Sequence, residues 1–423
     1  GSRMSGESTG IEKLTTIQRE FLKILESFMH GTEYHFPEKF AQLQELYQMA
    51  GIHNMTAAVY EQIRQEPLIA EPEYADLARI FKNNTVREVM MQMQRADGFL
   101  RVYRKICEQD IHPLVVKGMI CRNLYEKSDY RVSGDEDILV RKEDFALCDE
   151  ILLAEGFRRE PVETEHLPQE IPYMNPNNGV YIEMHFALFA EESGAYGHLN
   201  REFTDAQNTC ISENIQGQEV WTLNPTLHLF YLICHSLKHF LHGGFGIRQV
   251  CDMVMMEEHY GEEIDWEYIS GRLEALRMEG FWNGLTEIGK RYLGFSYEKA
   301  HYPASMQKDN VDCQNLLLDL LNSGIFGDST MERKHSSNIT LAAAESGKKD
   351  TVASVKASLF PGKDYMKKGY PWLEKYPWLL PVAWGMRILK YLGGNKKGKK
   401  DEPSGVEIGM SRVELLREYD IID

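Results

Sequence analysis

Apolar residues recur at intervals of three and four positions through most of the N-terminal quarter of the chain. The pattern is clear in 11–31 and in 40–53, and such spacing is typical of amphipathic helices. It continues from about Asp76 to Cys107, which predicts one long helix. We therefore expect a helical N-terminal region over residues 5–110, with a packing role.

The period changes after residue 110. Short β-branched or alternating runs predict four strands, within 112–118, 132–140, 180–188 and 219–223. Helical spacing lies between the first two and after the second, and a loop with several prolines precedes the third. Residues 111–223 are therefore expected to form an α+β core, with a small mixed sheet and helices on one face.

Helical spacing returns at Asn224, and Pro225 suits the first position of a helix that is expected to end at Gly243-Gly244. Further helical segments follow as far as residue 300. These observations predict a helical domain at 224–325, a linker at 326–352 and a C-terminal extension at 353–423.

The C-terminal extension is rich in tryptophan and proline, and lysines follow this cluster. Two interpretations are open: peripheral contact with an anionic membrane surface, or packing of Trp372, Trp378 and Trp384 on the protein itself. We favour packing. The longest uncharged run, Tyr376 to Met386, has eleven residues with two prolines, and it is too short to span a bilayer.

Composition narrows the class of protein. The chain has 423 residues, of which 43% are hydrophobic and 26% charged, and these values are typical of globular proteins. Its net charge of −17 disfavours a long nucleic acid as a partner. The seven cysteines are scattered without CxxC spacing, and no signal peptide opens the chain. We therefore expect a cytoplasmic protein without a disulfide framework or a cysteine zinc site.

The strand at 132–140 contains three consecutive acidic residues where a buried sheet favours apolar ones. Side chains alternate along a strand, so Asp135 and Asp137 share one face, while Glu136 points to the other and should reach solvent at the strand end. An Asp-x-Asp pair is often only a solvated turn, but here it lies within an apolar strand. Because two adjacent carboxylates repel each other, we expect a divalent cation between them, Mg²⁺ or Mn²⁺.

The strand at 180–188 supplies a third carboxylate. Its core-facing residues are Ile182, Met184 and Phe186, whereas Tyr181, Glu183 and His185 lie on the opposite face. Pairing of this strand beside 134–140 would bring Glu183 and His185 to the two aspartates. Three carboxylates on adjacent strands can hold two metal ions roughly 3.5–4 Å apart.

The helical domain carries further candidates. His235 and His239 are four residues apart and share a helix face, as do Arg248 and Asp252 on the next helix. Zinc binding by the histidines is disfavoured, because no Glu intervenes as in HExxH. Two hypotheses stay open: Lys238, His239 and Arg248 bind a triphosphate or an acceptor, or these helices carry ordinary salt bridges.

Several segments together are similar to a known family. They are VVKGMICRNLY, YRVSGDEDILVRKED, VYIEMHFAL, and LHLFYLICHSLKHF followed by GIRQVCDMVMM. They resemble the uncharacterised bacterial nucleotidyltransferase family, within the superfamily of nucleotidyltransferases resembling DNA polymerase beta. The resemblance covers about residues 15–300 and is most specific in 115–140 and 180–186.

This resemblance implies roles for the acidic residues. Asp135 and Asp137 would bind the metal ions, and Glu183 would complete the site and draw the proton from an acceptor hydroxyl. His185, on the same face as Glu183, is a candidate binding residue.

The resemblance also places a phosphate-binding position at Lys117 and Gly118. Lys-Gly replaces the superfamily's usual Gly-Ser or Gly-Gly, so one familiar serine contact to phosphate is missing. Lys117 could supply charge instead, and Arg131 is a second candidate as a bidentate donor.

The function predicted on these grounds is transfer of a nucleoside monophosphate from an NTP to a hydroxyl acceptor, with release of pyrophosphate. One alternative is an inactive nucleotide-binding or regulatory protein of the same fold, and another is metal-dependent phosphodiester hydrolysis. The three carboxylates argue against the first alternative, and the Lys-Gly position argues against the second. The acceptor and the base preference are not encoded in any motif of the sequence.

Overall fold

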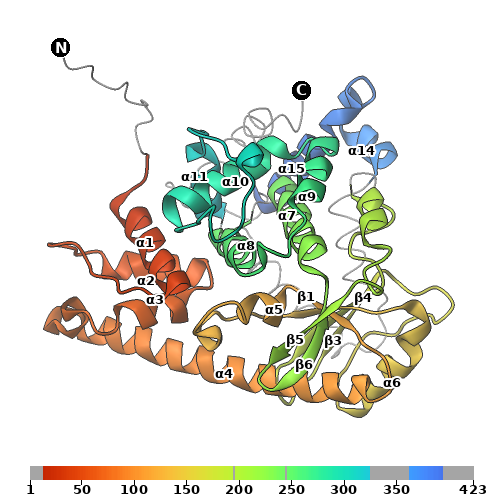
Figure 1. Cartoon of the computed structure of the whole chain (residues 1–423), viewed down its shortest axis with the longest axis horizontal. Helices are drawn as coiled ribbons and strands as arrows, with labels where there is room; N and C mark the ends of the chain where they lie inside the picture. Colours follow the sequence, from red (N-terminus) through yellow and green to blue (C-terminus); the bar gives the residue numbers. More distant parts are fainter. Residues whose placement is uncertain (1–12, 194–195, 243–244, 324–361, 394–423) are drawn as a thin grey trace.

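The computed structural model describes residues 13–193, 196–242, 245–323 and 362–393. The N-terminal helices are α1 (Thr16–His30), α2 (Leu43–Ile52), α3 (Thr56–Ile63) and α4 (Ala75–Cys107), with 3₁₀ turns at Pro67–Ala70 and Pro72–Tyr74. The long helix expected from Asp76 to Cys107 is therefore confirmed. It runs along one side of the molecule, with α1, α2 and α3 over its N-terminal half (Figure 1).

Helix α1 shows how local sequence sets the ends of an element. Thr15 and Gln18 form a capping box, in which the Thr15 hydroxyl accepts the Gln18 N–H and the Gln18 side chain accepts the Thr15 N–H. At the other end Gly31 has a φ of 69°, which a residue without Cβ adopts readily. The apolar face between these caps is buried against α3.

The core contains a six-stranded mixed sheet. Its strands are β1 (Leu114–Val116), β2 (Glu136–Leu139), β3 (Glu170–Met174), β4 (Tyr181–His185), β5 (Ile211–Ile215) and β6 (Gln218–Thr222). Their order across the sheet is β3-β4-β2-β1-β6-β5. The pairs β2–β4 and β1–β6 are parallel, and the other neighbours are antiparallel. The α+β class is confirmed.

The two edge strands are absent from the sequence-based prediction. Strand β3 lies in the segment expected to be a loop, because Pro172 and its neighbouring prolines are turn signals. Proline is tolerated there because β3 pairs only with β4 and forms an edge of the sheet. Strand β5 is half exposed and polar, and a hairpin with a left-handed Gln216-Gly217 turn joins it to β6.

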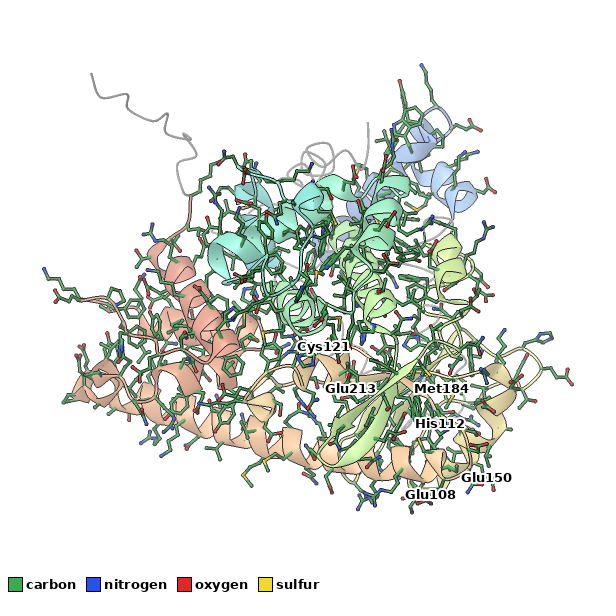
Figure 2. The ribbon with its side chains drawn as sticks, in the orientation of Figure 1. Glu108, His112, Cys121, Glu150, Met184 and Glu213 are labelled. Carbon is green, nitrogen blue, oxygen red and sulfur yellow. The ribbon has the colours of Figure 1, made fainter. Side chains whose placement is uncertain are left out.

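Each face of the sheet packs on helices. One face, with Val115, Ile138 and Met184, forms an apolar core with the C-terminal half of α4 and with α6 (Phe145–Ala154). Met184 lies in this core (Figure 2). The other face lies towards α7 (Pro225–His242), and it carries Asp137 and Glu183. Lys117 alone separates β1 from α5 (Gly118–Arg122).

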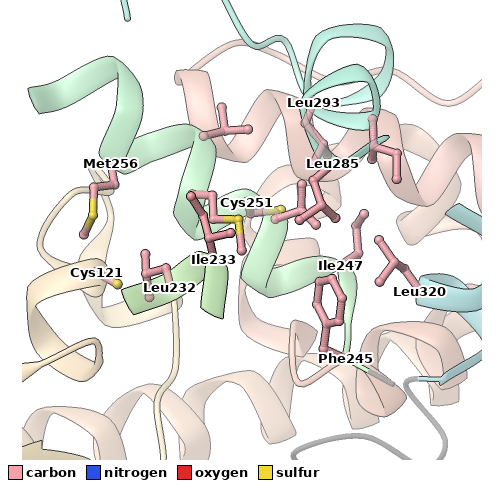
Figure 3. Packing of buried hydrophobic residues seen from close by; sticks show 14 of the residues in the cluster. Cys121, Leu232, Ile233, Phe245, Ile247, Cys251, Met256, Leu285, Leu293 and Leu320 are labelled. Carbon is pink, nitrogen blue, oxygen red and sulfur yellow. The ribbon is translucent and has the colours of Figure 1, made fainter. Parts of the chain in front are cut away.

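A second, larger core joins the helices around α7. These are α8 (Ile247–Tyr260), α9 (Trp266–Ala275), α10 (Glu279–Tyr292) and α11 (Gln314–Ser323). Figure 3 shows Leu232 and Ile233 of α7 among side chains from α8 and α10, and Cys121 of α5 beside them. Because α5 is separated from β1 by Lys117 alone, this core fixes α7 relative to the sheet.

The C-terminal extension is described from residue 362, where α14 (Lys363–Gly369) and α15 (Leu380–Gly393) flank two 3₁₀ turns. Trp384 is buried and stacks with Tyr196, and Trp372 is partly buried against the larger core, so the packing prediction is confirmed for these two. It is wrong for Trp378, which is 48% exposed. The expected linker at 326–352 lies outside the described residues, as do Gly243-Gly244. Among the helices described, none is long and apolar enough to span a membrane.

Glu257 of α8 is a buried carboxyl group in apolar surroundings. It is 3% exposed, it lines a small cavity with Val254 and Phe295, and its Oε1 has no hydrogen-bond partner among the described residues. Burial, and then the nearby Glu258, hold the pKa of Glu257 well above its usual range. The folded state therefore keeps this group protonated.

This burial predicts a pH-dependent loss of stability. Above the unfolded pKa of about 4.5 the unfolded chain releases the Glu257 proton and the folded chain retains it, so this group destabilises the fold as pH rises. Glu257→Gln should therefore gain stability relative to wild type at pH 8 compared with pH 5, measured by urea denaturation. The exposed Glu262→Gln should show no such difference, and an equal response of both variants would contradict the prediction.

Candidate active site

The parallel pairing of β2 with β4 creates the candidate site. The register places Asp137 directly beside Glu183, as expected if the two strands are neighbours. Potential ligand atoms of Asp137, Glu183 and His185 all lie within 4.8 Å of one another, and within the described part of the chain this is the group that could hold a metal ion. The pairing of the strands sets Asp137 beside Glu183, and alternation along β4 puts His185 on the same face, so the three polar side chains meet.

His185 lies between the carboxylates. Its Nε2 is 3.0 Å from Asp137 Oδ1 and 3.3 Å from Glu183 Oε2, and its Nδ1 is 3.4 Å from Glu170 Oε2 of β3. Burial by itself lowers the pKa of His185, but Asp137 and Glu183 outweigh burial and raise it to about 10. His185 is therefore a cation at neutral pH in this arrangement.

Lys117 approaches Asp137 from the end of β1. Its Nζ lies 3.3 Å from Asp137 Oδ2. Burial would raise the pKa of Asp137, but Lys117 and His185 act against burial and hold this pKa well below its usual range. The backbone of Lys117 has φ 59° and ψ −122°, a conformation that residues with a Cβ rarely adopt.

A short chain of hydrogen bonds holds this strained residue. The Lys117 N–H donates to His228 Nε2 of α7 over 3.0 Å, and His228 Nδ1 lies 3.4 Å from Thr222 Oγ1. The Thr222 hydroxyl donates to the Val115 carbonyl over 2.6 Å. Burial, with Lys117 nearby, lowers the pKa of His228 to about 3, so the imidazole stays neutral and can accept.

Two further histidines of α7 extend the site. Lys117 Nζ is 2.9 Å from His235 Nε2, and His235 Nε2 is 2.9 Å from His239 Nε2. Lys117 also lies over the Tyr231 ring, 5.9 Å from its centroid. Within the described residues His235 and His239 belong to no group of three metal ligands, so the zinc hypothesis gains no support.

The other basic candidates are placed differently. Lys238 is half-buried on α7, next to His239 in sequence. Arg248 Nη1 donates to the Val132 carbonyl over 2.9 Å, which ties α8 to the segment before β2. Phosphate binding by these two residues stays a prediction.

Arg131 requires a correction. It is 4% exposed, and its Nε and Nη2 form a bidentate pair with Asp252 at 3.1 and 2.5 Å, while its Nη1 donates to Val132 O. Tyr125 donates its hydroxyl to the same aspartate. All three guanidinium nitrogens are hydrogen-bonded inside the core and the side chain is buried, so Arg131 is not presented to a phosphate. Sequence reasoning made Arg131 a phosphate ligand because it lies near Asp-x-Asp and its partner Asp252 is 121 residues away.

Glu136 also departs from expectation. The sequence predicted that it reaches solvent, yet it is 7% exposed and its Oε2 accepts the Met119 N–H over 3.0 Å. Burial raises the pKa of Glu136 to about 7, although Arg122 and the Met119 N–H act against this rise. Glu136 therefore holds the start of α5 through the Met119 N–H. The prediction that Glu136 and Asp137 point to opposite faces is confirmed.

Gly118 is required by this contact. Its φ is 38°, and a Cβ at this position would lie 2.1 Å from Glu136 Oε2. Glycine thus lets the chain turn from β1 into α5 directly above the Glu136 carboxylate.

Asp135 lies just before β2 and is half-buried. Its charge helps to raise the pKa of Tyr181 on β4, after burial and Glu183. The Tyr181 hydroxyl is buried and has no hydrogen-bond partner among the described residues.

The donor set suits a hard divalent cation. Asp137 and Glu183 offer carboxylate oxygens within reach of one another and of His185, and such oxygens are the ligands of Mg²⁺ and Mn²⁺. Asp135 lies outside this group of three, so its part in metal binding stays a prediction. The residues present therefore fit the metal that the sequence predicted.

Some contributors were missed by sequence reasoning. Glu170 stands in the segment expected to be a loop, and His228 and His235 are separated from Lys117 by more than a hundred residues. His235 carried a usable signal, because its spacing from His239 was visible. Nothing in the sequence indicates Glu170 or His228.

The chain was compared with known proteins. A family model described as uncharacterised nucleotidyltransferase matches residues 41–294. No curated protein matches. Among solved structures, an antigenic nucleotidyltransferase-like protein from Paracoccidioides brasiliensis is 16% identical, with 39% of this chain and 75% of that chain covered and a TM-score of 0.27. A structural likeness at this level carries no argument.

The close approach at Gly118 predicts a specific stability loss. Gly118→Ala should force the Glu136 carboxylate from its Met119 N–H, in addition to the cost of a Cβ at positive φ. Gly217→Ala is the matched control, because Gly217 has φ 81° and nothing within 4 Å of its Cβ position. In urea denaturation, Gly118→Ala should lose at least about 1 kcal/mol more than Gly217→Ala. Equal losses would mean that Glu136 moves without cost.

The buried ion pair gives a second prediction. Asp252→Asn leaves the Arg131 charge uncompensated inside the core, and it should lower the free energy of unfolding by about 3–5 kcal/mol. Asp76→Asn breaks a largely exposed pair with Arg79 and should cost less than about 1 kcal/mol. Chemical denaturation measures both, and a small loss in Asp252→Asn would show that Arg131 is solvated.

Proposed function

The chain belongs to the uncharacterised nucleotidyltransferase family, and we propose that it transfers a nucleoside monophosphate from an NTP to a hydroxyl acceptor, in a reaction that depends on Mg²⁺ or Mn²⁺. A single observation carries this proposal. The register of β2 and β4 sets Asp137 beside Glu183, and Lys117 extends from the end of β1 to the same point. The two carboxylates can hold a divalent cation, and that cation together with the ammonium group would neutralise and align a triphosphate.

The acceptor oxygen attacks the α-phosphorus, and the bond to the bridging oxygen of pyrophosphate breaks. Glu183 takes the proton of the acceptor hydroxyl. A divalent cation held by Asp135, Asp137 and Glu183 offsets the phosphate charge when it is bound. Alignment of attacking and leaving oxygens accounts for most of the catalysis, and no covalent intermediate with the protein is needed.

The other residues orient these groups. His185 fixes the rotamers of Asp137 and Glu183 through its Nε2, and Glu170 holds the opposite edge of its ring. Lys117 contacts the phosphates, with His235 and His239 behind it on α7. The arrangement favours catalysis over a binding-only role, because binding alone does not require Asp137 beside Glu183.

Nucleotide-dependent stabilisation tests this proposal. Thermal shifts with each of the four NTPs, with and without Mg²⁺ or Mn²⁺, should show one metal-dependent stabilisation of about 2.7 kcal/mol at 100 times the dissociation constant. Asp137→Asn should abolish it. Asp97→Asn, an exposed change on α4 with the same charge difference, should retain it.

The outcomes separate the two candidate functions. A shift lost in Asp137→Asn, together with pyrophosphate release when acceptor hydroxyls are supplied, supports transfer. The same shift without pyrophosphate release from any acceptor would instead support the inactive nucleotide-binding protein. No shift with any NTP would overturn both.

A further inference from the structure

We propose that Lys117 is a resident cation of the active site, which competes with the divalent metal ion for Asp137 and moves towards α7 when the metal binds. This inference rests on the proposed function, since it concerns the same site. It assigns Lys117 a role before the nucleotide arrives, in addition to its contact with phosphate.

The first argument is position. Lys117 Nζ is 3.3 Å from Asp137 Oδ2, and this carboxylate is one of the ligands that a metal ion would need. An ammonium ion and a divalent cation repel each other strongly at such separations in a partly buried site. A metal ion on Asp137 would therefore repel the Lys117 ammonium group, and Lys117 in its present position weakens metal binding there.

The second argument is mobility. Two nitrogen groups contact Asp137, from His185 and Lys117. The His185 side chain is 8% exposed on a central strand and is held from both sides by Asp137 and Glu170. The Lys117 side chain is 25% exposed and has four rotatable bonds. Lys117 is therefore the group that yields.

The third argument is a destination on α7. Lys117 Nζ already lies 2.9 Å from His235 Nε2 and faces the Tyr231 ring. These contacts remain available after Nζ leaves Asp137, and an aromatic face attracts an ammonium ion. The shift needed is a rotation of the side chain, because His228 fixes the Lys117 backbone.

The fourth argument is the cost of placing a lysine here. With φ 59° and ψ −122°, a residue with a Cβ is strained, whereas glycine would be relaxed. The position retains this strain while it directs an ammonium group at Asp137. Strain at such a point is typical of a side chain that a site requires.

The experiment is an isothermal calorimetric titration of the metal-free protein with Mn²⁺ alone, which measures the dissociation constant of Mn²⁺. Lys117→Met removes the competing charge and should bind Mn²⁺ on the order of tenfold more tightly than wild type. Lys117→Gly also relieves the backbone strain, so it tests the same charge in a variant that is not destabilised by the Cβ. Both should show the tighter binding.

Two controls define the source of the effect. Lys142→Met changes the net charge equally at an exposed position past the far end of β2, and its Mn²⁺ affinity should equal that of wild type. Adding Asp137→Asn to Lys117→Met should remove the gain. Circular dichroism confirms that each variant is folded.

The possible failures are distinguishable. Equal or weaker Mn²⁺ binding in folded Lys117→Met and Lys117→Gly would overturn the competition, while the nucleotide-dependent stabilisation could still support the proposed function. Mn²⁺ binding that is unaffected by Asp137→Asn would place the metal elsewhere and overturn both. An equal gain in Lys142→Met would reduce the effect to net charge, and the inference would fail.

Discussion

The pairing of β2 with β4 is the constraint on which the rest of the site depends. It sets Asp137 directly beside Glu183. Two neighbouring carboxylates would destabilise the sheet if no positive charge lay close to them. His185 and Lys117 supply that positive charge, because both contact Asp137. The sheet therefore tolerates acidic residues in its centre because cationic side chains are built around them, and a metal ion has to replace part of that arrangement.

Lys117 connects the sheet to helix α7. Its backbone N–H meets His228 and its Nζ meets His235, so one residue of the sheet is held twice by α7. The larger apolar core, which includes residues of α5 and α7, fixes the position of that helix (Figure 3). The packing of the helices thus sets the position of Lys117 in the candidate site, so the site depends on the helices around α7 as well as on the strands.

The sequence predicted the central elements because their signals are local. The apolar run before Gly118, the alternation around Glu183 and the long periodic helix α4 each identify an element without knowledge of the rest. Strand β3 was missed because proline signals a turn unless the strand is known to be an edge. Arg131 was misassigned because its partner Asp252 lies in another helix.

By itself the sequence determined that Glu183 and His185 share a face, that Glu136 and Asp137 point to opposite faces, and that Lys117 follows a strand, because strand alternation follows from covalent geometry. Only the tertiary structure decided that β2 and β4 are parallel neighbours and that Glu136 is buried under Gly118. The same holds for the contact of Lys117 with α7. These facts depend on contacts between residues far apart in the chain, which no local periodicity encodes.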